Sequence, residues 1–437
     1  MRVGVVGAGV SGLVCGTRLS ALLRGADIPV KVTVLEWGRG PGGRTARRRV
    51  NVEGVGEVSF DHAAPFFTAT TAQFRREVLL DWEARSLVSR WAGQGETCLK
   101  VSEEPGQLWV GVPSNHAVCQ GLVAELKESG AEHLYGRHVT SARFVGNTWR
   151  VTAVNRLANP PTEETLEFDA LVLSDKLLVM PNVYAVLPPE ELGPLSLLLS
   201  ADPEAIHAAA TADALPSQSA VVLLLALAVP LPEALQAAFG NSRAVFGDAL
   251  REALGPQCDL ALVVHDSAKP GRPGGGGEGG GEGRVELFVV HSTERFAKVH
   301  LVADRGGGPV LDDPDAVRDH LCRQFYDAAG KLGAAASARS GPEAWPAPAY
   351  AAAVAWDHAS VAPEHRLRGS HRVDGLRRVG LCGDFFGGFS ESEGVGAVMG
   401  GVEAAALSGV ALAGELAAVL IEKHAADRGA ASRSAAI

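Results

Sequence analysis

The sequence predicts an α/β fold in which a domain with a parallel sheet and an antiparallel β-meander carries an inserted α+β domain. Residues 3–35 contain an apolar strand, a glycine-rich turn, a helix and a second strand, which form a βαβ unit with parallel strands. Residues 137–168 are typical of antiparallel strands. A strand at 377–381 and an Ala/Gly-rich helix at 393–422 return the chain to the first domain.

Each element follows from its apolar pattern and from the glycines and prolines that bound it. Strands are predicted at 3–6, 31–35, 137–145, 148–154, 165–168, 170–173, 220–229, 259–265, 285–291 and 377–381. Helices are predicted at 11–24, 72–86, 115–129 and 393–422. This order predicts one nucleotide-binding domain made of several segments and one substrate domain.

The predicted domain boundaries follow changes in amino-acid composition along the chain. The nucleotide-binding domain is predicted to comprise 1–68, 101–180 and 375–424, and the substrate domain 69–100 and 181–374, with a frayed tail at 425–437. Residues 269–284 read KPGRPGGGGEGGGEGR, which we interpret as a flexible insertion too poor in side chains to pack.

Composition excludes several classes of protein. The chain has 437 residues with 46% hydrophobic residues, enough to build a core, which excludes a wholly disordered chain. Its 40 Lys and Arg against 50 Asp and Glu give a net charge of −10, so we expect no nucleic-acid partner. The 6 cysteines are scattered without a CxxC pair, which argues against a zinc finger or disulfide scaffold, and we expect no metal.

The apolar runs and the start of the chain indicate whether the protein spans a membrane and in which compartment we expect it. The run 220–229 stops at Pro230, well short of the ~20 residues that a span needs. The stretch 394–421 carries Glu403 and Glu415, so we expect no membrane span. Because the first strand starts at Arg2, we expect a cytoplasmic protein, or an organellar one if a transit peptide was removed.

The first motif is a dinucleotide fingerprint. Gly7, Gly9 and Gly12 form a GxGxxG between the first strand and the first helix. The first glycine permits a tight turn, the second lets the backbone approach a diphosphate, and the third lets the helix pack on the sheet. The helix N-terminus favours phosphate. Glu36 ends the next strand, where an acid accepts from ribose hydroxyls.

Two further motifs favour FAD as the cofactor. Gly42, Gly43 and Arg44 follow Glu36, and an acid followed by GGR is the pattern of FAD-binding oxidases, in which the Arg neutralises the diphosphate. Near the C-terminus a strand ends in Gly383 and Asp384, and in such flavoproteins this Asp bonds the ribityl chain or diphosphate.

The helix after this strand has two possible registers at the flavin. It is placed either at Glu393–Gly394 or at Glu403–Gly409, and we favour the first. Its positive N-terminal end would then face the flavin edge on which negative charge develops during reduction.

From about Arg2 to Leu420 the chain resembles the renalase-like, amine-oxidase-type flavoproteins. The matching stretches are VGVVGAGVSG at the start, GGR at 42–44, FDHAAPFFT at 60–68, LKESGAE at 126–132, VVHST at 289–293, WDHASV at 356–361 and LCGDFF…SESEG at 381–394. The resemblance implies a Rossmann-type FAD-binding domain with an inserted substrate domain. It further implies cofactor contacts from Val10, Ser11, the Ala64–Pro65 backbone and the backbone at Val139, beside the adenine.

The resemblance also implies a reaction. Renalase-type enzymes take a hydride from isomeric dihydronicotinamides onto flavin N5 and pass the electrons to O₂, which gives H₂O₂. Trp356, His358 and His291 are the candidates for the substrate pocket, with Trp356 stacking on a planar ring. Three positions depart from the family pattern, in which Gly, Gln and Gly stand at Ala63, Pro65 and Phe385.

Other readings stay open on the sequence. A non-covalent FAD amine oxidase shares these motifs, whereas flavin tethered to a late Cys is excluded because none follows Cys382. A carotenoid- or porphyrinogen-type dehydrogenase needs an apolar tunnel, for which 221–227 and 195–199 offer walls. A flavin-binding protein without catalysis is the third alternative, and Pro65 beside N5 is the kind of change expected there. The sequence does not predict the oligomeric state.

Overall fold

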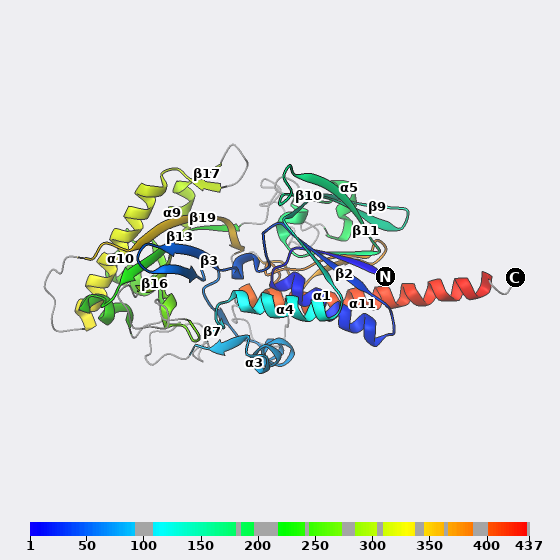
Figure 1. The fold of residues 1–437 in the computed structure, drawn as a ribbon, viewed down its shortest axis with the longest axis horizontal. Helices are drawn as coiled ribbons and strands as arrows, with labels where there is room; N and C mark the ends of the chain where they lie inside the picture. Colours follow the sequence, from blue (N-terminus) through cyan, green and yellow to red (C-terminus); the bar gives the residue numbers. More distant parts are fainter. Residues whose placement is uncertain are drawn as a thin grey trace.

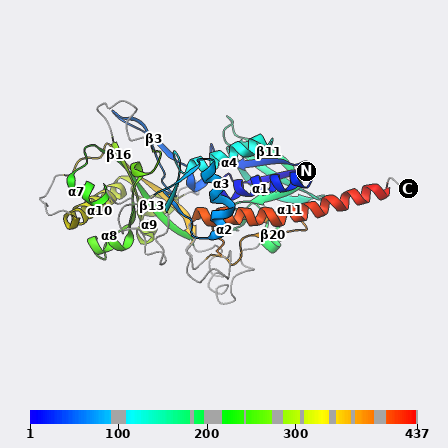
Figure 2. The ribbon, with the colours of Figure 1, turned by 90° about the horizontal axis from the view of Figure 1, so that it is seen from below.

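Two lobes lie side by side along the long axis of the molecule (Figures 1 and 2). The structure is a computed structural model of the chain. It describes residues 1–91, 108–180, 185–195, 217–240, 244–272, 285–303, 309–336, 345–361, 366–387 and 401–434.

The first lobe is built on a six-stranded sheet with the order β20-β21-β12-β1-β2-β8. All neighbours in it are parallel except β20 and β21, so the predicted parallel sheet is confirmed. Its strands are β1 (Arg2–Val6), β2 (Lys31–Glu36), β8 (Glu132–Tyr135), β12 (Ala170–Leu173), β20 (Arg372–Asp374) and β21 (Val379–Leu381). The glycine-rich turn after β1 therefore lies at the carboxyl edge of the sheet.

Both faces of this sheet are covered. Val3 and Val5 of β1 point into a core with the helices, and Val6 points into a second core with the meander, because successive side chains of a strand alternate. The helices are α1 (Val10–Gly25), α4 (His116–Glu128) and α11 (Gly401–Ser434), and the meander is β9 (Arg137–Val145), β10 (Thr148–Asn155) and β11 (Thr162–Phe168). Burial on both faces is the usual environment of parallel strands.

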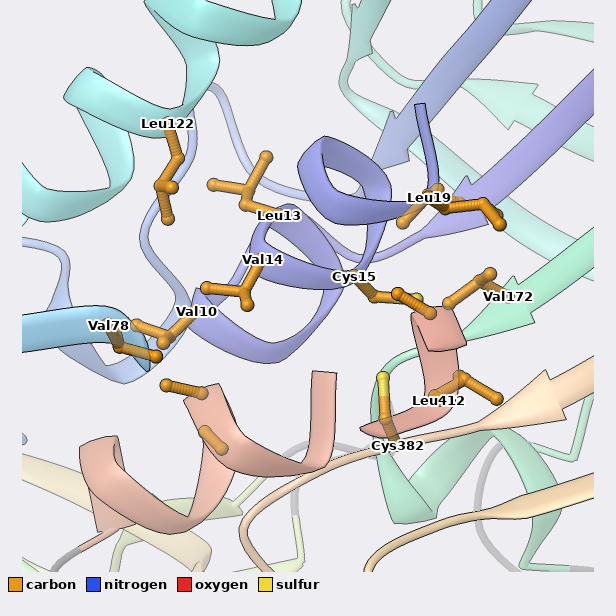
Figure 3. Close-up of a cluster of buried hydrophobic side chains, with 14 of the residues drawn as sticks. Val10, Leu13, Val14, Cys15, Leu19, Val78, Leu122, Val172, Cys382 and Leu412 are labelled. Carbon is orange, nitrogen blue, oxygen red and sulfur yellow. The ribbon is translucent and has the colours of Figure 1, made fainter. Parts of the chain in front are cut away.

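Helix α1 is the centre of the helical layer. Figure 3 shows its apolar side chains between Leu122 of α4, Val78 and the first turns of α11. Cys15 of α1 lies beside Cys382, which follows β21 (Figure 3). The two ends of the chain are therefore packed together in one core.

The second lobe is built on an antiparallel five-stranded sheet with the order β14-β15-β16-β13-β19. One face packs on helices through residues such as Leu223, Phe288 and Phe325. The other face packs on the hairpin that contains Val58, which shares a buried apolar cluster with Val222 of the sheet. Its strands are β13 (Ser217–Ala228), β14 (Ala244–Phe246), β15 (Leu260–His265), β16 (Val285–Ser292) and β19 (Tyr350–Val361), and its helices are α7 (Glu233–Leu235), α8 (Gly247–Leu254), α9 (Glu294–His300) and α10 (Pro314–Ala336).

Smaller elements complete the two lobes. The hairpin is β3 (Arg48–Val52) with β4 (Gly56–Phe60), and β5 (Phe67–Thr68), β6 (Val88–Arg90) and β7 (Leu108–Gly111) form a separate sheet. The remaining elements are α2 (Ala72–Phe74), α3 (Leu80–Ala84), α5 (Pro189–Leu192), β17 (Leu301–Ala303), β18 (Pro309–Leu311) and the short helical turns η1 (Gly43–Thr45), η2 (Arg75–Leu79), η3 (Lys176–Val179), η4 (Gly193–Leu195), η6 (Gln236–Gly240) and η7 (Asp266–Ala268).

The structure differs from the predicted boundaries in three places. Strand β20, which we assigned to the substrate domain, pairs with β21 of the first sheet. The helical segment 72–84, assigned likewise, packs in the first lobe because Phe74, Val78 and Trp82 share a core with α1. Residues 185–195 pack under the meander through Val186, Leu187, Leu192 and Leu195. In each case tertiary burial overrides the boundary that the local sequence suggested.

Two predictions about loose segments were also wrong. Helix α11 continues to Ser434, beyond the point at which we expected fraying, and it projects past the first lobe (Figures 1 and 2). The start of the glycine-rich stretch is packed, since Lys269 is only 3% exposed. Residues 273–284 lie outside the described part of the chain.

Helix α11 has the length and the composition of a membrane span, which the sequence had led us not to expect. Its window of highest hydropathy is 61% buried inside the protein. Glu403 in its first described turn is fully buried and accepts hydrogen bonds from Thr70 and Thr71. Length and hydropathy are also satisfied by a core helix, so they are weak evidence for a membrane.

Candidate functional site

A cavity of about 820 Å³ lies between the carboxyl edge of the first sheet and the second sheet. Most of the residues predicted to bind a cofactor or substrate line it. These are Gly7, Gly9, Val10, Ser11, Glu36, Gly42, Gly43, Arg44, Ala64, Pro65, Val139, His291, Trp356 and Asp384. Segments from both ends of the chain therefore meet around one space.

Five predicted residues are placed elsewhere or are not described. Gly12 and Gly383 are not among the residues that line the cavity. Glu393 and Gly394 lie outside the described residues. His358 belongs to β19, and its side chain is outside the described part of the structure.

Gly7, Gly9 and Gly12 form a turn that we call the glycine corner, and it has the geometry that their spacing predicts. Gly7 has φ +101, and its N–H donates to Leu35 O at 2.8 Å, which closes the turn against β2. A Cβ at Gly12 would lie 2.4 Å from Gly7 O, so only glycine lets α1 start this close to the turn. A Cβ at Gly9 would meet nothing within 4 Å. Gly9 therefore leaves open space at the N-terminus of α1, where backbone N–H groups favour an anion.

Glu36 joins this corner to the second strand. Its carboxylate accepts from Ala8 N at 2.7 Å and from Gly38 N at 2.6 Å, one bond on each oxygen. Burial raises the pKa of Glu36, and these backbone donors oppose the rise. Since each carboxylate oxygen has more than one acceptor site, the side chain keeps acceptor capacity for a hydroxyl group.

An aromatic pair follows Glu36 at the same end of the cavity, and the sequence had not suggested it. The rings of Trp37 and His138 stack with 4.2 Å between centroids and 19° between planes. The Arg156 guanidinium lies over the Trp37 ring at 5.4 Å. Trp37, His138 and Val139 all line the cavity.

Arg44 and Asp384 form a bidentate ion pair across the cavity wall. Their two hydrogen bonds measure 2.5 and 2.6 Å. Gly42, with φ +131, donates its N–H to Ala8 O at 2.8 Å and so brings the Arg44 turn to the glycine corner. Burial opposes the charge of Asp384, but Arg44 overcomes this and the pKa of Asp384 is lowered.

More cationic charge surrounds this pair than the sequence had indicated. Arg366 lines the cavity with Arg44 and Asp384. Both Arg366 and the buried Lys176 help to lower the pKa of Asp384. Burial lowers the pKa of Lys176 and of Arg366 themselves. Their placement depends on tertiary packing, so no local motif signals them.

The other end of the cavity is apolar and aromatic, with Pro65, Phe66 and Leu262 in its wall. His291 lines it, and its Nε2 lies 2.7 Å from His62 O, within hydrogen-bond distance. The His62 and Trp356 rings lie 5.2 Å apart at 54°. Burial lowers the pKa of both His62 and His291 to about 4, so both rings are neutral at pH 7.

The first described turn of α11 completes the wall. Gly401, Val402 and Ala405 line the cavity, and a Cβ at Gly401 would lie 3.3 Å from Asp384 Oδ2. Glu403 holds this turn in place by accepting four hydrogen bonds from Thr70 and Thr71, at 2.7–3.0 Å. The register that we favoured, at Glu393–Gly394, stays a prediction.

Comparisons with known proteins agree with this architecture. Residues 5–81 match the model of the NAD(P)-binding Rossmann-like domain. The chain has a Rossmann-type dinucleotide-binding fold. No curated protein matches the chain.

Similar solved structures cover nearly the whole chain at low identity. A candidate protoporphyrinogen oxidase from Exiguobacterium sp. 255-15 matches with a TM-score of 0.54 and 9% identity, over 95% of this chain and 98% of its own. An oxidoreductase from Methanosarcina mazei matches with a TM-score of 0.52 and 13% identity, over 94% and 99%. An anhydrotetracycline hydroxylase from Streptomyces rimosus has a TM-score of 0.46 and 16% identity, and the match spans 96% of this chain but 62% of that protein. The first two likenesses support the fold.

Proposed function

We propose that the protein is an FAD-dependent oxidoreductase whose coenzyme lies in the cavity between the lobes. The observation that carries this proposal is the Arg44–Asp384 pair beside the glycine corner. It joins an early GGR turn to a late Gly-Asp strand end, and both motifs are expected around the coenzyme of an FAD oxidase.

The residues present fit such a coenzyme. Gly9 leaves the space that a diphosphate needs, and Arg44 and Arg366 supply positive charge at the same cavity. Glu36 would accept from ribose hydroxyls, and the same acid disfavours a 2′-phosphate. Trp37 and Val139 would then contact the adenine.

The apolar and aromatic end of the cavity is where we propose that a small planar substrate is oxidised. Bound FAD would supply a ring that accepts a hydride equivalent. Trp356 and His291 line the wall there, and His291 is uncharged at neutral pH. A dihydropyridine gives up a hydride without giving up a proton, so this wall needs no general base. We propose isomeric dihydronicotinamides as substrates and O₂ as the acceptor, which gives H₂O₂.

One observation favours a second candidate, a non-covalent amine oxidase. Asp357 lines the same cavity, and its Oδ1 accepts from Ser219 Oγ at 2.7 Å. Asp357 is exposed, and a carboxylate at the cavity attracts a cationic group such as a substrate ammonium.

Anaerobic reduction of the FAD-loaded protein tests these proposals. α-NAD(P)H is expected to bleach the flavin absorbance, and readmitted O₂ is expected to restore it with formation of H₂O₂. Bleaching by primary or secondary amines alone would replace the first candidate with the second. If neither donor class bleaches the bound flavin, catalysis of either kind is wrong.

A further inference from the structure

A buried ion cluster lies outside the cavity and joins the two lobes. It consists of Asp61 after β4 and of Asp266, Lys269 and Arg272 after β15, and we call it the Asp61 cluster. Lys269 Nζ lies 3.3 Å from Asp61 Oδ2 and also pairs with Asp266, and Arg272 pairs with Asp61. The Asp61 and Lys269 side chains are 1% and 0% exposed. Buried charges of this kind are strongly destabilising when one partner is removed.

Asn115, at the start of α4, connects this cluster to the cavity wall. Its backbone N–H donates to Asp61 Oδ1 at 3.1 Å. Its side-chain oxygen accepts from Gly111 N at 2.6 Å, and its side-chain nitrogen donates to Ala64 O at 2.5 Å. Asn115 is only 2% exposed, so these bonds do not compete with bulk water.

The segment 61–65 is held from both lobes. Ala64 N donates to Arg44 O at 3.1 Å. This bond holds the segment against the turn that carries Arg44, the ion-pair partner of Asp384. On the other side, His62 O lies 2.7 Å from His291 Nε2. Pro65 has no N–H to donate, so the two bonds of Ala64 fix the part of the segment that lines the cavity.

We propose that Asn115, held by the Asp61 cluster, is a positioning residue that sets the Ala64–Pro65 wall against the coenzyme. It thereby makes the environment of the coenzyme depend on how the second lobe docks through Lys269 and Arg272. This inference rests on the proposed function, because it needs FAD in the cavity.

The test compares Asn115→Ala with a matched change in the second lobe. Gln324 offers the same chemistry far from the segment: its amide accepts from Asp259 N at 2.8 Å and donates to Gln257 O at 3.1 Å. Both variants and the wild type are loaded with FAD, and the visible flavin spectrum, the FAD dissociation constant and the thermal midpoint are measured. A merely structural role moves the midpoint alone.

We expect Asn115→Ala to shift the flavin absorption bands and to weaken FAD binding about tenfold, the order of one lost buried hydrogen bond. Gln324→Ala leaves both quantities at wild-type values. Lys269→Met is expected to reproduce the spectral shift from the second lobe, because it removes a partner of Asp61.

An unchanged spectrum and dissociation constant in folded Asn115→Ala would overturn the inference. If that variant does not fold, Asn115→Asp is measured in its place, since it keeps the acceptor for Gly111 N and loses the donor to Ala64 O. A wild-type protein that takes up no FAD instead contradicts the proposed function. The two failures are therefore distinguishable.

Discussion

Arg44 and Asp384 are 340 positions apart in the chain and are joined by two charge-assisted hydrogen bonds of 2.5 and 2.6 Å. The Asp384 side chain is 6% exposed and the Arg44 side chain is 31% exposed, so the carboxylate is the shielded partner of the pair. It closes the first lobe at the cavity and supplies the polar groups that we assign to the diphosphate and ribityl part of FAD.

Removing one member of this pair is expected to destabilise the protein. Arg44→Met leaves the Asp384 carboxylate buried without its main partner, which costs about 3–5 kcal/mol of unfolding free energy. Asp81→Asn, which breaks an exposed pair with Arg85, is expected to cost about 0–1 kcal/mol. Denaturant unfolding measures both. Equal effects of the two changes would show that the Arg44–Asp384 pair has no special structural weight.

The glycine corner allows stability and cofactor binding to be separated. Gly9→Ala places a methyl group in open space, so the protein is expected to fold as the wild type does while losing at least about tenfold in FAD affinity. Gly12→Ala places it 2.4 Å from Gly7 O and is expected to destabilise the fold by about 1–3 kcal/mol. Thermal unfolding without FAD and FAD titration are the paired measurements. Wild-type FAD affinity in Gly9→Ala would place the diphosphate elsewhere.

The buried His62 gives the stability a pH dependence of known sign. Burial, assisted by Arg48 and His291, lowers its pKa to about 4, against an ordinary value of about 6.5. As the pH falls, His62 is protonated in the unfolded chain before it is protonated in the folded protein. Its contribution to the unfolding free energy is therefore complete above about pH 6.5 and is lost as the pH drops toward 4. The expected loss is up to about 3 kcal/mol. The slope of the unfolding free energy against pH over this range is expected to be smaller in His62→Gln than in the wild type. An unchanged slope would contradict a neutral His62.

The Trp37–His138 pair distinguishes the two halves of the coenzyme. Trp37 lines the cavity where we place the adenine, and burial of apolar surface against it is worth on the order of 1 kcal/mol, so Trp37→Ala is expected to weaken FAD binding by about fivefold. FMN has no adenine, and its affinity is expected to stay within about twofold of the wild-type value. Fluorescence titration with each flavin makes the comparison. Equal losses for FAD and FMN would move the adenine away from Trp37.

The sequence was informative where chemistry and local backbone geometry coincide. The GxGxxG, Glu36 and Arg44 are separated by few residues, and their spacing already predicts a turn, a strand end and a charged loop around one ligand. The same holds for the parallel sheet, because a βαβ unit leaves one direction for the second strand.

What the sequence missed depends on contacts between distant segments. Trp37 meets His138, and Arg366 reaches the cavity of Arg44, only after segments far apart in the sequence have packed together in the first lobe. Lys269 stands in a Gly/Pro-rich stretch whose composition indicates a loose loop. Its burial is set by Asp61, which lies 208 positions away, and composition carries no signal of that pairing.

Titration of the purified, flavin-free protein with FAD, followed by gel filtration, tests the central claim most directly. We expect one equivalent of FAD to bind, to change its visible spectrum and to remain with the protein through the column, and Asp384→Leu to lose it. A folded wild-type protein that stays colourless and releases all of the FAD would contradict the account.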